Sequence, residues 1–219
     1  MLLGVAVAGV LAAIISLSVG EGGPQAERIG DVGPVQQLFG GIAQEGARLG
    51  DPDAEVTISV FTDLRCAPCA DYQIETIDPL VEELARTGEA QFALRHYSLG
   101  SESMTLAAEG AVAAGAQGRQ WQFADLLMRN LGAAGAEVDD EFLADIANSL
   151  GQLDADEWRA DRSSPAVAET LANDDEEGAA LELQGDGASL LVTGPGGTED
   201  LGVEPSREEI QAAAAAVSG

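Results

Sequence analysis

The scarcity of cysteine limits the kinds of site that this sequence can build. Its 219 residues include two cysteines, and both lie in the unit Cys66-Ala67-Pro68-Cys69. Because no third thiol is available for a structural bridge, a small secreted scaffold held by several disulfides is excluded. A ring closed between the two cysteines spans too few residues to stabilise the chain much by loop closure. We therefore expect the pair to serve chemistry rather than stability.

Positive charge is scarce as well. The sequence has 10 basic residues, all of them arginine, against 38 acidic ones, which gives a formal net charge of -28. A surface this acidic repels phosphate backbones, so we expect no nucleic-acid partner. A solvated acidic surface is the favoured interpretation, and a specific basic partner is the alternative.

Metal ligands are few. Structural zinc needs four ligands, and the chain offers two cysteines and one histidine. A redox function is therefore favoured, with no metal and no cofactor expected. A metal site shared between two chains and a motif without activity stay open as alternatives.

Charged side chains are absent from residues 1–20, MLLGVAVAGVLAAIISLSVG. About 18 helical residues would cover roughly 27 Å, close to the hydrocarbon thickness of a bilayer. The segment is predicted as a transmembrane anchor or a cleaved signal peptide. The anchor is favoured, because no basic residue precedes the run and Ser18-Val19-Gly20 is only a passable cleavage site. We expect the rest of the chain on the extracytoplasmic side, on a single-pass anchor or exported after cleavage.

Two further regions follow the apolar run. Residues 21–45 are rich in Gly, Gln, Glu and Pro and are predicted as a flexible tether, partly docked near Leu38-Phe39. Residues 46–219 are predicted as an α/β domain. With 46% apolar but 4% aromatic residues, Ala, Leu and Val should build most of its core.

The first part of this domain has the pattern of a βαβ unit. Residues 56–62, VTISVFT, are apolar and rich in β-branched side chains, which predicts a strand. Helical periodicity runs from Cys69 to about Arg86, and Pro79 is expected to kink or restart that helix. A second strand is predicted at 90–99. The CxxC motif would then lie at the carboxyl end of the first strand.

The remainder of the domain is predicted as helices followed by two strands. A helical insertion over about 103–180 contains expected helices at 103–117, 119–131, 140–150, about 157–158, and 164–180. Strands at 189–193 and 198–203 flank a turn at 194–197. Ser206 and Glu209 form a capping box that begins a last helix to Val217.

The motif has the chemistry of a redox pair. At a strand-to-helix junction, Cys66 lies at the helix N-terminus, where free N–H groups and the helix dipole lower the pKa of its thiol. Pro68 suits the first turn. Cys69, one turn on, is placed to release a substrate from a mixed disulfide. Arg65 is a candidate for cationic stabilisation, with a solvated role favoured. Asp63 is either a proton acceptor for Cys69 or a turn residue.

The stretch from Leu49 to Ala54 and the later VTISVFTDLRCAPCADY resemble the active-site opening of the membrane-tethered, DsbA-like branch of the thioredoxin superfamily. RHYSLGSES and AAGAQGRQWQFADLLMRNLG resemble the beginning of that branch's helical insertion. The resemblance covers about residues 40–217. It implies a thioredoxin fold with an inserted helical subdomain, and oxidation of the thiols of exported proteins. It also implies regeneration by a membrane quinone-linked partner of the DsbB or vitamin K epoxide reductase type.

Two positions depart from that family. Ala67-Pro68 is closer to the thioredoxin pattern than to the family's usual motif, which predicts a less oxidising protein than a strong DsbA. The family also carries a cis-proline that faces the cysteine pair, and the matching stretch Gly187-Ala188-Ser189 has none. Ala188, or Gly187 with a one-residue shift, falls at that position. A cis bond without proline costs about 2.5–4 kcal/mol, so a trans peptide is expected.

For the other candidate residues, structural or solvated roles are favoured over functional ones. His96 is predicted as a structural histidine rather than a proton shuttle or ligand, and Trp121 and Phe123 as core residues rather than groove residues. Asp174 to Glu177 is predicted as a solvated helix end. Two functions from different classes follow: a disulfide oxidoreductase attacking through Cys66, or a non-catalytic binding module or cysteine-based metal carrier, which the missing proline supports.

Overall fold

The computed structural model describes residues 29–97, 102–134, 138–183 and 187–219. The predicted anchor or signal segment, residues 1–20, lies outside these ranges. Within them, no helix combines the length and the apolar composition that crossing a membrane requires.

The sheet contains six strands in the order β1-β2-β4-β3-β5-β6. The parallel pair at its centre joins β3 (Thr57–Thr62) to β4 (Gln91–His96), with Thr62 opposite His96. Strand β5 (Ser189–Gly194) runs antiparallel to β3, and β6 (Gly197–Val203) forms the outer edge. The short strands β1 (Gln44–Glu45) and β2 (Arg48–Leu49) extend the other edge. The predicted βαβ unit and the late hairpin are confirmed.

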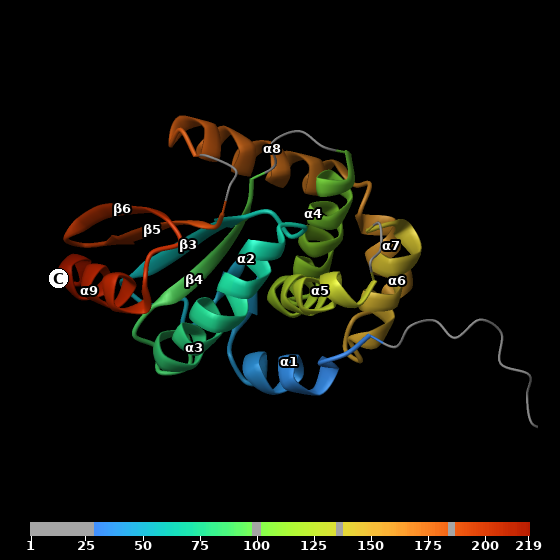
Figure 1. Ribbon diagram of the computed structural model, residues 1–219, viewed down its shortest axis with the longest axis horizontal. Coiled ribbons are helices and arrows are strands. Elements are labelled where there is room, and N and C mark those ends of the chain that lie inside the picture. The colour runs from blue at the N-terminus through green and yellow to red at the C-terminus, as the bar shows by residue number, and fades with distance from the viewer. Residues whose placement is uncertain (1–28, 98–101, 135–137, 184–186) are drawn as a thin grey trace, which may run out of the picture.

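Helices cover both faces of this sheet and build the insertion (Figure 1). Helix α8 lies on one side, against β4, while α9 packs against β5 on the other. The insertion between β4 and β5 is confirmed, with the predicted helices matched to within a few residues at most ends. The helices of the insertion and the last helix are α4 (Glu102–Gly115), α5 (Gln120–Ala134), α6 (Asp140–Ser149), α7 (Ala155–Asp161), α8 (Pro165–Ala180) and α9 (Arg207–Val217).

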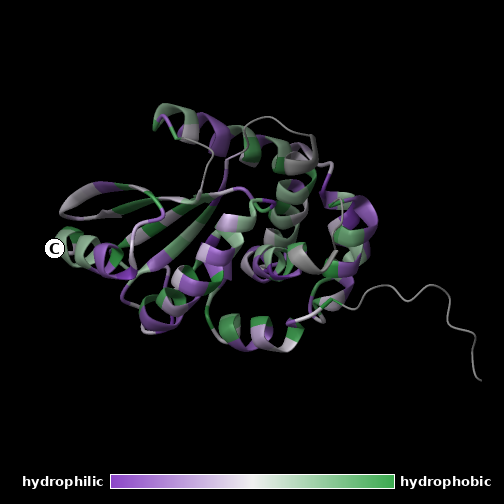
Figure 2. Ribbon diagram, in the orientation of Figure 1, coloured by the Kyte–Doolittle hydropathy of each residue, from purple (hydrophilic) through white to green (hydrophobic). Residues whose placement is uncertain are grey.

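Helix starts and the core follow the sequence closely. The capping box at Ser206 and Glu209 is present at the start of α9. Hydrophobic residues run along the central strands (Figure 2). Ile58 and Leu190 have no exposed surface, and Leu94 is 1% exposed. Alanine is frequent in this core, as the low aromatic content predicts. Packing of small side chains brings the insertion close to the sheet.

The structure differs from the expected tether over much of residues 21–45. Helix α1 (Val32–Phe39) lies within that range, and Val35 and Phe39 are buried. The Phe39 ring lies 6.3 Å from that of Trp121 in α5. The apolar side chains, spaced one helical turn apart, bury a face against the insertion, which a Gly- and Pro-rich composition does not reveal. The part of the tether before Ile29 lies outside the described residues.

The redox helix stays helical across Pro79. Its backbone runs from α2 (Ala67–Tyr72) through the π-helical turn η1 (Gln73–Ile77) and α3 (Asp78–Leu80) to a second π turn, η2 (Val81–Ala85). In the wider π turn, the backbone N–H of Asp78 donates to the carbonyl of Gln73, five residues earlier. The helix therefore continues through Pro79 without a break. The expected kink or restart is thus replaced by two π turns.

Candidate redox site

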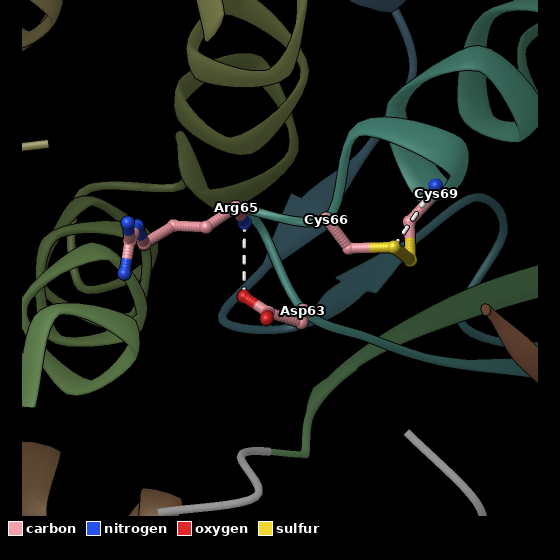
Figure 3. Close-up of a disulfide and its surroundings, with 4 residues drawn as sticks. All are labelled: Asp63, Arg65, Cys66 and Cys69. Carbon is pink, nitrogen blue, oxygen red and sulfur yellow. Dashed lines mark hydrogen bonds between the residues drawn. A yellow bond between two sulfur atoms is a disulfide. The ribbon is translucent and has the colours of Figure 1, made fainter. Parts of the chain in front are cut away.

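The two cysteines lie at the junction between β3 and the redox helix. They are joined in a disulfide, with their Cα atoms 5.1 Å apart (Figure 3). Cys66 is the N-cap of α2, and its sulfur accepts the N–H of Cys69 at 3.1 Å. Cys66 is half-buried, whereas Cys69 is 1% exposed. One sulfur is therefore accessible to another molecule, and the other is shielded behind it.

The residues between the cysteines form the exposed start of the helix. Ala67 and Pro68 are both exposed, and Pro68 is in the first turn, where no N–H partner is lost. The sulfur of Cys66 faces a backbone N–H of that turn. A thiolate formed there on reduction gains from this hydrogen bond and from the helix dipole, which lower the pKa of a thiol.

Asp63 and Arg65 shape the turn that leads into the motif. The Asp63 carboxylate accepts the backbone N–H of Arg65 at 2.9 Å, and its carbonyl accepts that of Cys66. Burial raises the pKa of Asp63, while the Arg65 N–H and charge oppose the rise. The Arg65 side chain extends away from the disulfide (Figure 3). The geometry gives Asp63 a turn-forming role, because its carboxylate and its carbonyl both accept backbone N–H groups of the turn.

The stretch at the family's cis-proline position lies beside this turn. Phe61 pairs with Ser189 across the antiparallel β3–β5 ladder, so the residues before Ser189 extend past the end of β3 towards the motif. Ala188 and Ser189 are each 2% exposed, and Gly187 is half-buried. No cis peptide bond occurs among the described residues, as expected where proline is absent.

A tyrosine that sequence reasoning missed ties the redox helix to the last loop. Tyr72, three residues after Cys69, donates its hydroxyl to the carbonyl of Pro205 at 2.6 Å. Burial raises the pKa of Tyr72, and the negative charges of Glu204 and Glu209 raise it further. Nothing in the local sequence pairs Tyr72 with Pro205, since the contact joins residues 133 positions apart.

His96 belongs to a buried polar cluster between the sheet and the insertion. Its Nε2 lies 3.0 Å from the amide nitrogen of Gln120, which donates, so the ring proton lies on Nδ1. Burial, together with the charge of Arg95, lowers the pKa of His96 to about 4. The ring is therefore neutral near pH 7. Within the described residues, His96 Nδ1 and Thr62 Oγ1 have no hydrogen-bond partner.

Asp174 corrects one expectation. Although the sequence predicted a solvated helix end, Asp174 is 1% exposed and accepts the backbone N–H of His96 and a guanidinium N–H of Arg95. Burial raises the pKa of Asp174 to about 6, while these bonds oppose the rise. Its helix, α8, turns this one acid of the run towards β4. A contact between residues 78 positions apart leaves no local sequence signal.

A second buried cluster lies under the middle of the redox helix. Arg129 of α5 pairs with both Asp78 and Asp125, and Gln73 donates to Asp78 at 2.9 Å. Burial and the neighbouring Asp125 raise the pKa of Asp78 to about 8, and burial raises that of Asp125 to about 6. The i,i+4 spacing of Asp125 and Arg129 on a helix is the one part of this cluster that the sequence signals.

The remaining predicted residues have structural roles. Trp121 and Phe123 are 1% and 0% exposed and pack against Phe92 and Trp158, which confirms them as core residues. Within the described residues, no group of three His, Cys, Asp or Glu side chains is arranged to hold a metal ion. A cavity of about 660 Å³ lies between the β1–β2 hairpin, α4 and α8, and neither cysteine lines it.

A family model described as thioredoxin matches residues 43–182. The probable disulfide bond formation protein D of Bacillus cereus is 25% identical over 150 residues, which are 67% of this chain and 69% of that protein. The corresponding protein of Bacillus anthracis is 27% identical over the same coverage.

Solved structures share the architecture at lower identity. BdbD from Bacillus subtilis superposes with a TM-score of 0.66 at 17% identity, covering 80% of this chain and 95% of that one. A thioredoxin-like oxidoreductase from Silicibacter pomeroyi gives a TM-score of 0.62 at 23% identity, covering 76% of this chain and 88% of that one. These likenesses support the fold, including the helical insertion.

Proposed function

Because the chain belongs to the thioredoxin family and is a DsbA-like thiol–disulfide oxidoreductase, we propose that it forms disulfides in exported proteins outside the cytoplasm. The observation that carries this proposal is the asymmetry of the pair. The Cys66 sulfur is accessible at a helix N-terminus, and Cys69 is buried behind it. The names of the Bacillus relatives, disulfide bond formation proteins, agree with this direction.

The reaction proceeds by two exchanges. A substrate thiolate attacks the Cys66 sulfur, which forms a mixed disulfide and releases Cys69 as a thiolate or thiol. A second substrate thiolate then attacks the substrate sulfur of the mixed disulfide, and Cys66 leaves as a thiolate. The substrate gains a disulfide and loses two electrons and two protons, which the Cys66–Cys69 pair and the solvent take up.

Stabilisation of the leaving group favours the second exchange. The Cys69 N–H that bonds the Cys66 sulfur and the N-terminal dipole of α2 both stabilise Cys66 as a thiolate. A stable leaving thiolate makes the reduced form favourable and the disulfide oxidising. Pro68 supplies no further stabilisation, so we place the potential between those of thioredoxin and of a strong DsbA, about -270 to -120 mV.

Catalytic turnover requires reoxidation of the pair. We propose a membrane quinone-linked partner of the DsbB or vitamin K epoxide reductase type, which accepts the two electrons through exchange with Cys66. The uncharged run of residues 1–20 supports a location at the membrane, since such a segment holds the domain near that partner.

The activity is tested with the purified protein in its oxidised form and a peptide carrying two cysteines. We expect peptide thiols to disappear in proportion to the protein added, and the Cys66→Ser variant to be inactive. The matched Cys69→Ser variant keeps the Cys66 thiol but cannot form the disulfide of the pair, so it should not oxidise the peptide thiols. When the peptide is supplied as its disulfide, the Cys66 thiolate of this variant should break that S–S bond and accumulate as a mixed disulfide, with the other peptide sulfur released as a thiolate. Unchanged activity of Cys66→Ser would contradict exchange through Cys66, and a wild-type protein without activity would indicate a binding module instead.

The location is tested by labelling in intact cells. After mild reduction, a maleimide that does not cross membranes should modify Cys66, and no other thiol interferes because the chain has two cysteines in a single motif. Labelling that appears only after the cells are lysed would contradict an extracytoplasmic domain.

A further inference from the structure

An acidic and an apolar side chain lie at the end of the sheet that carries the redox pair. The ladder between β3 and β5 carries Gly187 and Ala188 past the end of β3, to the turn that begins at Asp63. On the other side of β5, Ser189 pairs with Val203, the last residue of β6. The residue after it, Glu204, therefore lies at the same end of the sheet as the cysteines.

Contacts hold Glu204 against Gly187 and Ala188. Its backbone N–H donates to the carbonyl of Ala188 at 2.8 Å. A Cβ built on Gly187 would lie 2.7 Å from Cγ1 of Val203 and 2.8 Å from Oε1 of Glu204. The missing side chain of Gly187 is what lets both residues cover it. Glu204 has a φ of 46°, in the left-handed region that residues with a Cβ rarely adopt, so the loop fixes it in an uncommon conformation.

The redox helix contacts the loop of Glu204 on the side away from Gly187 and Ala188. Pro205, the next residue, accepts the hydroxyl of Tyr72, one turn beyond Cys69. The charge of Glu204 also acts on that hydroxyl, because it contributes to the raised pKa of Tyr72. Glu204 thus lies between the Gly187–Ala188 stretch and the helix that carries the disulfide.

Both side chains are available to another molecule. Val203, 47% exposed, is the exposed large apolar residue of the described part of the chain, and Glu204 is exposed as well. Among the ion pairs of the described residues, Glu204 takes part in none, and the neighbouring Arg207 is paired with Glu83. The carboxylate therefore presents an unneutralised negative charge next to an apolar contact.

We propose that Glu204 and Val203 form a specificity subsite for polypeptides that carry a lysine or arginine close to the reacting cysteine. Such a side chain places its aliphatic stem on Val203 and its charge on the Glu204 carboxylate. The inference rests on the proposed exchange at Cys66. Because the ion pair is exposed to solvent, its contribution is modest, roughly two- to fivefold in kcat/KM.

The test compares two peptide substrates that differ in one residue. Each carries the same two cysteines, with either lysine or glutamate beside the first. We expect the wild-type protein to favour the lysine peptide, and Glu204→Gln to reduce the ratio of the two kcat/KM values by roughly two- to fivefold. Raising the salt concentration should reduce the wild-type ratio in the same sense.

Glu199→Gln is the matched control, since it removes the same charge from β6, the strand that ends just before Glu204. Glu199 lies opposite Val192 in the β5–β6 ladder. It precedes Val203 by four residues, which is about 13 Å along β6. This separation exceeds the screening length of about 8 Å at physiological salt. The control should keep the wild-type ratio. A Glu204→Gln ratio equal to that of wild type, or an equal drop in Glu199→Gln, would overturn the subsite.

The two levels of inference fail in different ways. If neither peptide is oxidised faster by the wild-type protein than by Cys66→Ser, the proposed oxidoreductase function is wrong. If both peptides are oxidised through Cys66 but Glu204→Gln leaves their ratio unchanged, the exchange stands and the subsite alone is wrong.

Discussion

The start of the redox helix and its middle lie in opposite surroundings. At its start, the open end, Cys66, Ala67 and Pro68 meet solvent, and the hydrogen bonds come from the backbone. About three turns on, in the closed segment, Asp78 is buried and shares Arg129 with Asp125. The open end allows another protein to reach a sulfur, whereas the closed segment holds the helix to the insertion.

This contrast separates reactivity from stability. Loss of a partner is expensive where water is excluded, because the remaining charge has no other means of solvation. At the open end, water replaces most lost contacts. We therefore expect substitutions at the closed segment to change the free energy of unfolding, and substitutions near the motif to change activity with small effects on stability.

The largest effect is expected from Arg129→Leu at the closed segment. Removing the guanidinium leaves the buried Asp125 carboxylate without a counter-charge and takes a hydrogen-bond partner from Asp78, which should lower the free energy of unfolding by about 3–5 kcal/mol. Urea denaturation followed by circular dichroism measures it. The matched variant Arg159→Leu breaks the exposed pair with Asp156 and should cost about 1 kcal/mol or less. Similar losses in the two variants would show that burial does not make the closed segment more sensitive than an exposed surface.

A pH dependence should come from the same cluster. Burial raises the pKa of Asp78 to about 8 in the folded protein, against about 4 in the unfolded chain. The folded state thus holds a proton that the unfolded state has released. Its stabilising effect is fully present below pH 4 and is lost as the pH rises towards 8, by about 1.4 kcal/mol per pH unit for each proton.

Asp78→Asn isolates this proton from the rest of the acidic chain. The amide imitates the protonated acid, so the decline in stability between pH 5 and 8 should be flatter by about one proton. Asp71→Asn changes an exposed carboxylate of the same helix and should keep the wild-type slope. Denaturation curves at several pH values compare the three proteins. Parallel slopes for wild type and Asp78→Asn would show that the cluster holds no proton.

The smallest effect is expected near the open end, from Tyr72→Phe. It removes the hydrogen bond to Pro205 and should cost about 0.5–1.5 kcal/mol of folding free energy. Tyr97→Phe is the matched control, because the Tyr97 hydroxyl has no hydrogen-bond partner among the described residues. Thermal unfolding measures both. A loss as large as that of Arg129→Leu would show that the open end is also a stability anchor.

Local patterns predicted much of the fold. The β-branched run before the motif and the helical periodicity of the insertion gave strands and helices at nearly the observed positions. The capping box at Ser206 and Glu209 needs four consecutive residues, so it is visible in the sequence and present in the structure. The site prediction at Cys66 and Cys69 has the same origin, since the motif and the helix that follows it are contiguous.

Tertiary contacts explain the differences. Helix α1 lies in a segment whose glycines and prolines predicted a tether, and it gains stability by burying Val35 and Phe39 on the insertion. Asp174 belongs to an acidic run that is typical of a solvated surface, and a bond to the backbone of His96 buries it. Pro79 is accommodated because the surrounding helix widens into π turns.

The sequence alone determined the redox chemistry, because one CxxC unit at a strand-to-helix junction carries it within a few residues. Only the tertiary structure decided what borders that chemistry. The approach of Glu204 and Val203 to Gly187, and of Tyr72 to Pro205, depends on strand register and on contacts between distant segments. Such contacts follow from the packing of the whole sheet and leave no mark in the local pattern.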